Sequence, residues 1–202
     1  MTKKFLRIYH LYLNSKGVIS VIHFKVKINH TRFKNKPTSE EIAKIAKHFT
    51  TTTLNPHLLK KAIESGKSIL PCVTNEFGEF YQQVFFVDVD NNTNETFRSV
   101  TRNLQKAQAN MLPPILIYPT FSYTPANQKH RMIFLFDRAI DDAVTRDRIQ
   151  IFLNNTFMGD SRTKNKKRIF YGTSKRAFFS SKSAIDTDAI LKRIEVTSYD
   201  TI

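Results

Sequence analysis

Residues 83–92, Gln-Val-Phe-Phe-Val-Asp-Val-Asp-Asn-Asn, form an apolar and β-branched run that ends in two aspartates. This composition predicts a buried β-strand. Because side chains alternate along a strand, Asp88 and Asp90 should share one face, with their Cα atoms roughly 6.5–7 Å apart. Two carboxylates this close repel each other unless a cation lies between them, and Mg²⁺ or Mn²⁺ prefers such oxygen ligands. The alternative is a strand end whose aspartates begin a solvated turn at Asn91 and Asn92.

The 202 residues carry a formal net charge of +15, which favours a polyanionic partner, either nucleic acid or an anionic membrane surface. No acidic residue precedes Glu40, and the segment from Arg162 to Arg176 is basic and free of acids. Such regions can be plain solvated surfaces, but two of them on either side of an acidic strand end favour a nucleic-acid track. We assign nucleic-acid binding to Lys25, Lys27, Arg162, Lys164, Lys166 and Lys167.

Several classes of protein are excluded by simple absences from the sequence. A single cysteine, Cys72, rules out an internal disulfide and a cysteine-rich zinc site. The six histidines show no HxH or HExxH spacing, which argues against zincins and against histidine-pair nucleases. No apolar run approaches the roughly 20 residues of a membrane span, so we expect a cytoplasmic protein with no membrane partner. No GxxxxGK[ST] motif occurs, so a helicase is expected only as a separate or C-terminally fused partner.

Residues 1–82 are expected to form an N-terminal α/β elaboration packed on a core, because no Gly/Ser/Pro-rich linker separates the two. Two β-rich runs joined by a glycine-containing turn predict an initial β-hairpin of Phe5–Leu13 and Val18–Ile28. Two capped helices follow, beginning at Thr38 and Asn55 and ending near His48 and Gly66. The stretch from Thr50 to Thr53 is interpreted as a helix break. A strand at residues 68–74 and a loop at residues 75–81 complete this part.

Residues 83–176 are expected to form the core of the protein, and residues 177–202 a C-terminal tail with one helix. The expected elements are a strand at 84–90, a helix at 94–109, strands at 115–121 and 129–136, a helix at 137–152 and a strand at 168–171. This order, β-α-β-β-α-β, is that of the ferredoxin-like or RRM-like α+β fold, with helices on one face of an antiparallel sheet. Phe85, Val87 and Val89 should face the helices, which leaves Asp88 and Asp90 on the open face.

Further polar residues fall where the same open face can gather them. Ser122 and the group Lys129-His130-Arg131 lie at the predicted second hairpin, and Asp160 and Arg168 lie around the last strand. The motifs FFVDVDNN (85–92), YPTFSYTPANQKHRMIFLFD (118–137) and GDSRTKNKKRIFYGT (159–173) occur in this order. Together they resemble the archaeo-eukaryotic primase superfamily, particularly primase-polymerase domains of plasmid, phage and mobile-element replication proteins. The resemblance covers about residues 69–176.

The resemblance implies template-directed nucleotidyl transfer on single-stranded DNA, with ribonucleoside or deoxyribonucleoside triphosphates as substrates. Asp88, Asp90 and Asp160 would be the catalytic carboxylates that hold two Mg²⁺ or Mn²⁺ ions. Nucleotide phosphates would be bound by residues of the second and third motifs, namely Ser122, Lys129, His130, Arg131 and Arg168. Strand alternation allows Lys129 with Arg131, or His130, to face the site, and two cations suit a triphosphate better than one imidazole.

Two positions depart from the pattern of that family. Gln128 stands where a serine usually precedes the histidine, and Asn165 stands where a further aspartate is common. Two alternative functions therefore remain open at this point: a catalytically inactive nucleic-acid-binding replication module of the same fold, and a metal-dependent nuclease or relaxase, which we rank last. Each site residue also has a structural alternative, since Asp160 follows Gly159 in a typical turn and His130 suits a half-buried strand position.

Overall fold

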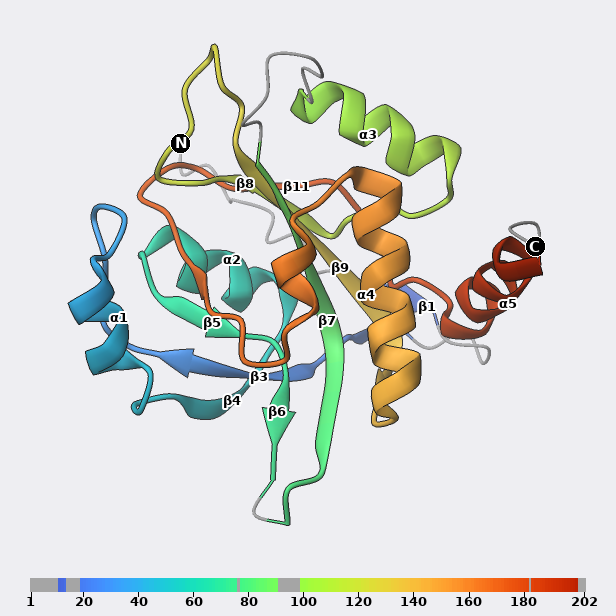
Figure 1. Ribbon diagram of the computed structural model, residues 1–202, viewed down its shortest axis with the longest axis horizontal. Coiled ribbons are helices and arrows are strands. Elements are labelled where there is room, and N and C mark those ends of the chain that lie inside the picture. The colour runs from blue at the N-terminus through green and yellow to red at the C-terminus, as the bar shows by residue number, and fades with distance from the viewer. Residues whose placement is uncertain (1–10, 14–18, 76, 91–98, 182, 200–202) are drawn as a thin grey trace, which may run out of the picture.

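A five-stranded antiparallel sheet runs through the centre of the molecule, in the order β11-β8-β9-β7-β6 (Figure 1). The computed structural model describes residues 11–13, 19–75, 77–90, 99–181 and 183–199. The predicted aspartate strand is β7, which pairs with β9 in a register that places Asp88 opposite Arg131. The strands of this sheet are β6 (Val73–Thr74), β7 (Phe80–Val89), β8 (Leu116–Pro119), β9 (His130–Ile140) and β11 (Phe178–Phe179).

One face of this sheet is covered by helices α3 (Val100–Ala109), α4 (Ala143–Phe157) and α5 (Thr187–Tyr199). Phe85, Val87 and Val89 are fully buried and pack in one cluster with residues of all three helices. The predicted orientation of the strand is therefore confirmed. None of the helices in the described parts of the chain is both long and apolar enough to cross a membrane.

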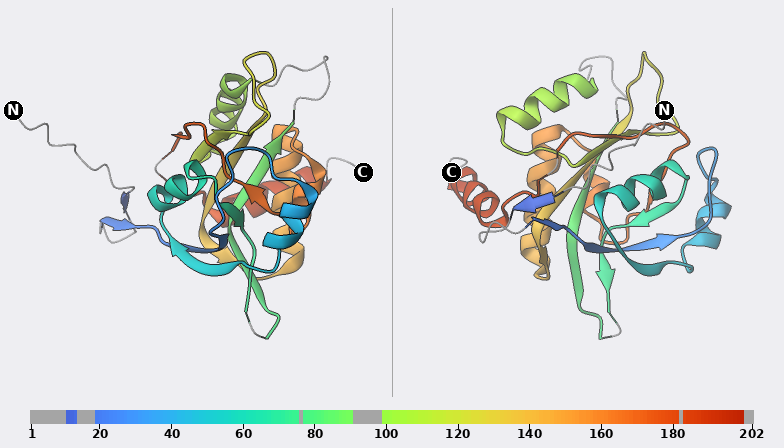
Figure 2. Two further views of the ribbon diagram at one scale, coloured as in Figure 1. Left: turned by 90° about the vertical axis from the view of Figure 1, so that its left-hand side faces the viewer. Right: turned by 180° about the vertical axis from the view of Figure 1, so that it is seen from behind.

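The opposite face, predicted to be open, is largely covered by a second antiparallel sheet and α2 (Pro56–Glu64), seen from behind in Figure 2. Val84 and Phe86 point into this layer, where Phe86 stacks on Phe170 with ring centroids 4.5 Å apart. Beyond Phe86 the apolar packing ends and Asp88 begins the polar end of the face. The second sheet has the order β10-β5-β3-β4, with β3 (Phe24–Asn29), β4 (Thr50–Leu54), β5 (Ser68–Leu70) and β10 (Phe170–Tyr171).

The last strand of the predicted ferredoxin-like order does not join the central sheet. Strand β10 pairs instead with β5, through Phe170 opposite Ile69. The edge of β7 that a fourth strand would use is already occupied. Its Phe86 carbonyl accepts a hydrogen bond from the Gln150 side chain, and its Asp88 carbonyl accepts one from the backbone N–H of Asp160. The result is an α+β fold with two stacked antiparallel sheets, in which the segment after α4 crosses from one sheet to the other.

The N-terminal elements follow the sequence prediction in part. Helix α1 (Ser39–Ile45) has the predicted capping box at Thr38, and α2 has the predicted Asn55 cap. The predicted helix break at 50–53 is instead strand β4, and the predicted strand at 68–74 divides between two sheets as β5 and β6. Strands β1 (Leu11–Leu13) and β2 (Ile19–Val21) do pair as a hairpin, but β3 leaves it for the second sheet. The expected turn at 14–17 and the helix start at 94–98 lie outside the described residues.

Candidate functional site

A pocket of about 470 Å³ opens at the C-terminal end of β7. Four segments line it: the N-terminal side of α1 with Lys36, the end of β7 with both aspartates, the connection from β8 to β9, and the segment 162–171 after α4. Of the predicted residues it contains Asp88, Asp90, Ser122, Lys129, Arg131, Arg162, Lys167 and Arg168. A second cavity, of about 710 Å³, lies at the other end of β7 beside Glu79, Asp141 and Asp142 and contains none of the predicted site residues.

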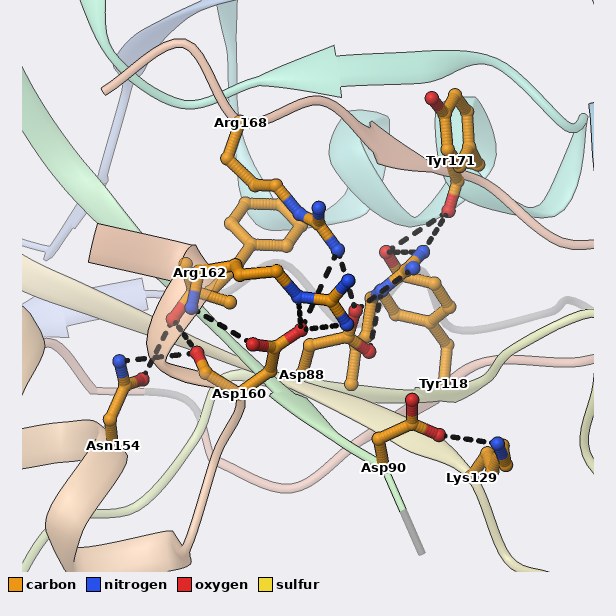
Figure 3. A network of polar contacts seen from close by, with 12 residues as sticks. Asp88, Asp90, Tyr118, Lys129, Asn154, Asp160, Arg162, Arg168 and Tyr171 are labelled. Carbon is orange, nitrogen blue, oxygen red and sulfur yellow. Dashed lines mark hydrogen bonds and ion pairs between the residues drawn. The ribbon is translucent and has the colours of Figure 1, made fainter. Parts of the chain in front are cut away.

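Asp88 forms a buried, bidentate ion pair with Arg131 on the neighbouring strand (Figure 3). Arg131 Nε lies 3.1 Å from Asp88 Oδ1 and Arg131 Nη2 lies 3.2 Å from Oδ2. The third guanidinium nitrogen donates to the Tyr171 carbonyl at 2.7 Å and lies 3.5 Å from the Tyr118 hydroxyl. Burial acts against the charged form, but the charge of Asp88 outweighs it, so the pKa of Arg131 is raised above its ordinary value. Arg131 is therefore a fixed internal counter-ion of Asp88.

Asp160 is brought to the same place by the chain after α4. Its backbone N–H donates to the Asp88 carbonyl at 2.9 Å, and its carboxylate caps the 3₁₀ helix η1 (Ser161–Lys164). The side chain accepts from Arg162 Nε at 2.7 Å. Arg168 Nη2 lies 3.8 Å from Asp160 Oδ2 and 3.7 Å from Asp88 Oδ2, so one guanidinium stands between two carboxylates. Partial burial raises the pKa of Asp160, but the hydrogen bonds and charge of Arg162, with the charge of Arg168, outweigh it and lower that pKa overall.

Asp90 holds a separate cation from the adjoining strand. Lys129 Nζ lies 2.6 Å from Asp90 Oδ1, and both side chains are partly exposed in the pocket (Figure 3). The structure thus brings Asp88 and Asp160 together around Arg168, while Asp90 is paired with Lys129. Three carboxylates and four cations form a single polar centre at the end of β7.

These residues fit a hard divalent cation in the kind of ligand they offer. Carboxylate oxygens are what Mg²⁺ and Mn²⁺ bind, and a positive group already stands between Asp88 and Asp160 in the form of Arg168. The three aspartates do not converge on one point, however. Within the described ranges, no three His, Cys, Asp or Glu side chains are placed to hold one ion together. Asp88 and Asp160 are the residues that would hold such an ion once Arg168 has moved away from them, and Asp90 would contribute only after leaving Lys129.

His130 is not in the pocket, contrary to the nucleotide-binding role assigned to it. Strand alternation turns it to the helix side, where it is fully buried and its Nε2 lies 3.1 Å from Asn103 Nδ2 of α3. Burial lowers the pKa of its imidazole, although the hydrogen bond to the Gln128 carbonyl opposes the shift. Gln128 faces the same helix, because its side chain accepts from the backbone N–H of Val100. Gln128 and His130 thus both support α3, whereas Lys129 and Arg131 face the pocket.

The predicted nucleic-acid residues occupy two different surfaces. Arg162 and Lys167 line the pocket, and Lys164 is exposed on η1 beside them. Lys166 lies outside the pocket, with its ammonium 4.0 Å above the ring of Phe80. Lys25 and Lys27 project from β3 on the side away from its buried residues, and Lys25 lies 5.7 Å from the Tyr81 ring centroid. Lys166 and Lys25 thus lie against the rings of two consecutive residues at the start of β7.

The sequence analysis did not identify several residues of the site, because no motif or apolar pattern marks them. Lys36 reaches the pocket from the basic loop before α1, a segment with no apolar pattern. Thr163, Gln150 and Asn154 are buried polar residues that join η1 to α4. Thr163 Oγ1 lies 2.9 Å from Asn154 Oδ1 and 2.7 Å from the Asp160 carbonyl, and Gln150 reaches the Phe86 carbonyl. These bonds fix the backbone that carries Asp160.

Among the comparisons with known proteins, only the search of solved structures gives matches. No protein-family model matches the chain, and no curated protein does. Over most of its length, the chain matches the structures of primase catalytic domains. One is the archaeo-eukaryotic primase (AEP) domain of the cyanophage S-2L primase-polymerase, with 13% identity, a TM-score of 0.49, and coverage of 84% of this chain and 87% of that one.

Two further matches are to the primase RepB′. Its catalytic domain, solved in complex with initiator DNA, has 10% identity, a TM-score of 0.47, and coverage of 89% and 88%. A second RepB′ structure has 10% identity and a TM-score of 0.44, and the match covers 89% of this chain and 59% of that one. The cyanophage domain carries the name of the family that the sequence motifs resemble. The function proposed for this chain rests on its own side chains.

Proposed function

We propose that this protein is a nucleotidyltransferase of the primase-polymerase type, which joins nucleotides on a single-stranded DNA template with Mg²⁺ or Mn²⁺. The observation that carries the proposal is the meeting of Asp88, Asp90 and Asp160 with Lys129, Arg162 and Arg168 at one pocket. Carboxylates that can gather cations, beside basic side chains that can bind phosphate, are what nucleotidyl transfer requires. The order of the three motifs along the chain supports the same assignment.

We assign different roles to these residues according to their burial and their bonding partners. Asp88, Asp90 and Asp160 would hold the metal ions, which when bound activate a primer 3′-hydroxyl and neutralise the leaving pyrophosphate. Lys129, Arg162 and Arg168 would bind the triphosphate and orient its α-phosphate toward that hydroxyl. Arg131 would not touch phosphate, because Asp88 and the Tyr171 carbonyl already take its donors. Its role would be to hold Asp88 in place, which revises the predicted phosphate contact.

The template would lie along the basic segment after α4. Lys164 and Lys167 are exposed there, next to the pocket. Phe121 and Tyr171, which line the pocket, offer ring faces on which a base can stack. Single-stranded nucleic acid is commonly bound by such a combination of cations and aromatic rings.

A second candidate function is a nucleic-acid-binding module without turnover. One observation favours it: Arg131 binds both carboxylate oxygens of Asp88, so the first acidic residue is already neutralised within the protein. A module of this kind would keep the charge and the pocket and would bind single-stranded DNA, but it would not require a metal.

Primer extension and de novo synthesis on single-stranded DNA separate the two candidates. We expect product with Mg²⁺ or Mn²⁺ and either ribonucleoside or deoxyribonucleoside triphosphates, and loss of product in Asp90→Asn and Asp160→Asn with DNA binding retained. Asp141→Asn, an exposed acid outside the pocket, is the matched control and should keep full synthesis. Binding without synthesis under every condition would favour the module, and cleavage of the template would indicate a nuclease.

A further inference from the structure

Every carboxylate at the site is paired with a cation, and the cations differ in how firmly they are held. The Arg131 side chain is 10% exposed, that of Lys129 19%, that of Arg168 31% and that of Arg162 69%. Arg131 has additional bonds to the Tyr171 carbonyl and contacts with two rings. Because an exposed ion pair contributes little and rearranges easily, Arg162, Arg168 and Lys129 can change partners whereas Arg131 cannot.

The charge of the pocket favours an anionic ligand over a free metal ion. Of the described residues that line it, six are basic and two are acidic, with Asp160 next to them. The basic ones are Lys36, Lys129, Arg131, Arg162, Lys167 and Arg168. A pocket with this balance attracts an anion and repels a free divalent cation. Guanidinium groups bind phosphate in the same forked geometry that they use for carboxylate, so a polyphosphate can take over the donors now used by aspartates.

We infer that the pocket binds the polyphosphate of a nucleotide without metal, through an exchange of counter-ions. Arg162 and Arg168 leave Asp160, and Lys129 leaves Asp90, to bind phosphate oxygens, and the released carboxylates then become available to a metal ion. The ligand class rests on the proposed function. The exchange itself rests on the ion pairs of this chain, and Arg131 stays on Asp88 throughout.

This exchange predicts effects of opposite sign for two neighbouring substitutions. Asp160→Asn keeps an oxygen for the backbone N–H of Arg162 but removes the charge that holds Arg162 and Arg168. It should therefore strengthen polyphosphate binding and weaken the binding of metal alone. Arg162→Ala removes a phosphate donor and a competitor of the metal, so it should weaken polyphosphate binding and strengthen the binding of metal alone. Each shift should be about fivefold, the scale of a partly exposed ion pair.

The test uses the full chain and two probes. Inorganic tripolyphosphate is titrated in EDTA by calorimetry, and free Mn²⁺ is titrated separately by electron paramagnetic resonance. Arg148→Ala is the matched control, because it removes an exposed positive charge on α4 outside the pocket, and it should change neither affinity. A circular dichroism melt of each variant checks that it is folded.

The outcomes separate this inference from the proposed function. Opposite shifts in Asp160→Asn and Arg162→Ala, with Arg148→Ala unchanged, support the exchange even if the wild type makes no product on a DNA template. If the wild type synthesises product but tripolyphosphate fails to bind in EDTA, the exchange is wrong and the polymerase assignment stands. Equal losses in Arg162→Ala and Arg148→Ala would also overturn it, because binding would then depend only on total charge.

Discussion

The side chain of Arg131 stabilises the charged carboxylate of Asp88 in a nearly buried position. Arg131→Ala would leave that carboxylate without its main partner, and unpaired buried charges are strongly destabilising. We expect the free energy of unfolding to fall by about 3 kcal/mol, measured by urea denaturation. The double variant Asp88→Asn with Arg131→Met should recover much of this loss, since it removes both charges. Lys129→Ala, one residue earlier and more exposed, should cost less than about 1 kcal/mol, and an equal cost for both would contradict the internal counter-ion.

A second prediction at this scale concerns pH and His130. Burial lowers its pKa in the folded protein, whereas the unfolded chain has the ordinary value of about 6.5. As the pH falls below that value, the unfolded chain takes up the proton first. The stability that neutral His130 contributes is therefore fully present above about pH 6.5 and is lost as the pH falls below it. We expect His130→Gln to be less stable than wild type at pH 7.5, and the difference between their free energies of unfolding to narrow as the pH falls to 5.5. His57→Gln, at an exposed position, is the control; an unchanged gap for His130→Gln would refute the prediction.

At the scale of elements, the position of Asp160 depends on how α4, η1 and β7 are joined. Buried polar side chains form this joint. Arg146 bonds Gln82 of β7 and the Lys164 carbonyl of η1, and Thr163 bonds Asn154 and the Asp160 carbonyl. Since these groups are shielded from water, each lost hydrogen bond leaves an unsatisfied partner. The joint is therefore expected to matter for activity although none of its side chains faces the pocket.

Thr163→Val tests the joint, because it replaces a buried hydroxyl with a methyl group of similar size. We expect the free energy of unfolding to fall by about 1–2 kcal/mol and primer extension to fall with little change in nucleotide KM, since Asp160 would be misplaced and not removed. Thr163→Ser should restore both quantities by returning the hydroxyl. Ser161→Ala, which removes an exposed hydroxyl from the same 3₁₀ helix, is the control. Failure of the serine variant to restore activity would show that the hydroxyl is not what positions Asp160.

On the scale of the whole molecule, the net charge of +15 should govern the binding of single-stranded DNA. Each phosphate contact with a single strand contributes a slope of about −0.7 to the plot of log affinity against log salt. Exchange of Lys164, Lys166 and Lys167 for Gln should make the slope less steep by roughly two, and exchange of Lys25 and Lys27 by roughly one. Fluorescence anisotropy at several salt concentrations measures this. Lys192→Gln on α5, a helix that contributes no residue to the pocket, should leave the slope unchanged, and an equal effect there would indicate that no track exists.

The sequence by itself determined the local elements and the direction of the aspartate strand. Period-2 alternation placed Phe85, Val87 and Val89 toward the helices, and short capping motifs located α1 and α2 correctly. These features depend on residues within a few positions of one another, and such patterns can be read directly. Strand β4 was missed for the same reason, because its polar run of threonines has one buried residue, Leu54, and no alternation.

Only the tertiary structure decided how the aspartates are used. The pairing of Asp88 with Arg131 depends on the register between β7 and β9, and the arrival of Asp160 depends on how α4 and η1 are joined to β7. The second sheet also covers the face that was expected to be open. Such contacts join residues far apart in the chain, and their selection depends on which hydrogen-bonding edges and apolar faces remain available once the other elements have packed. Local patterns could place the carboxylates on a strand end, but only packing could assign each of them a cation.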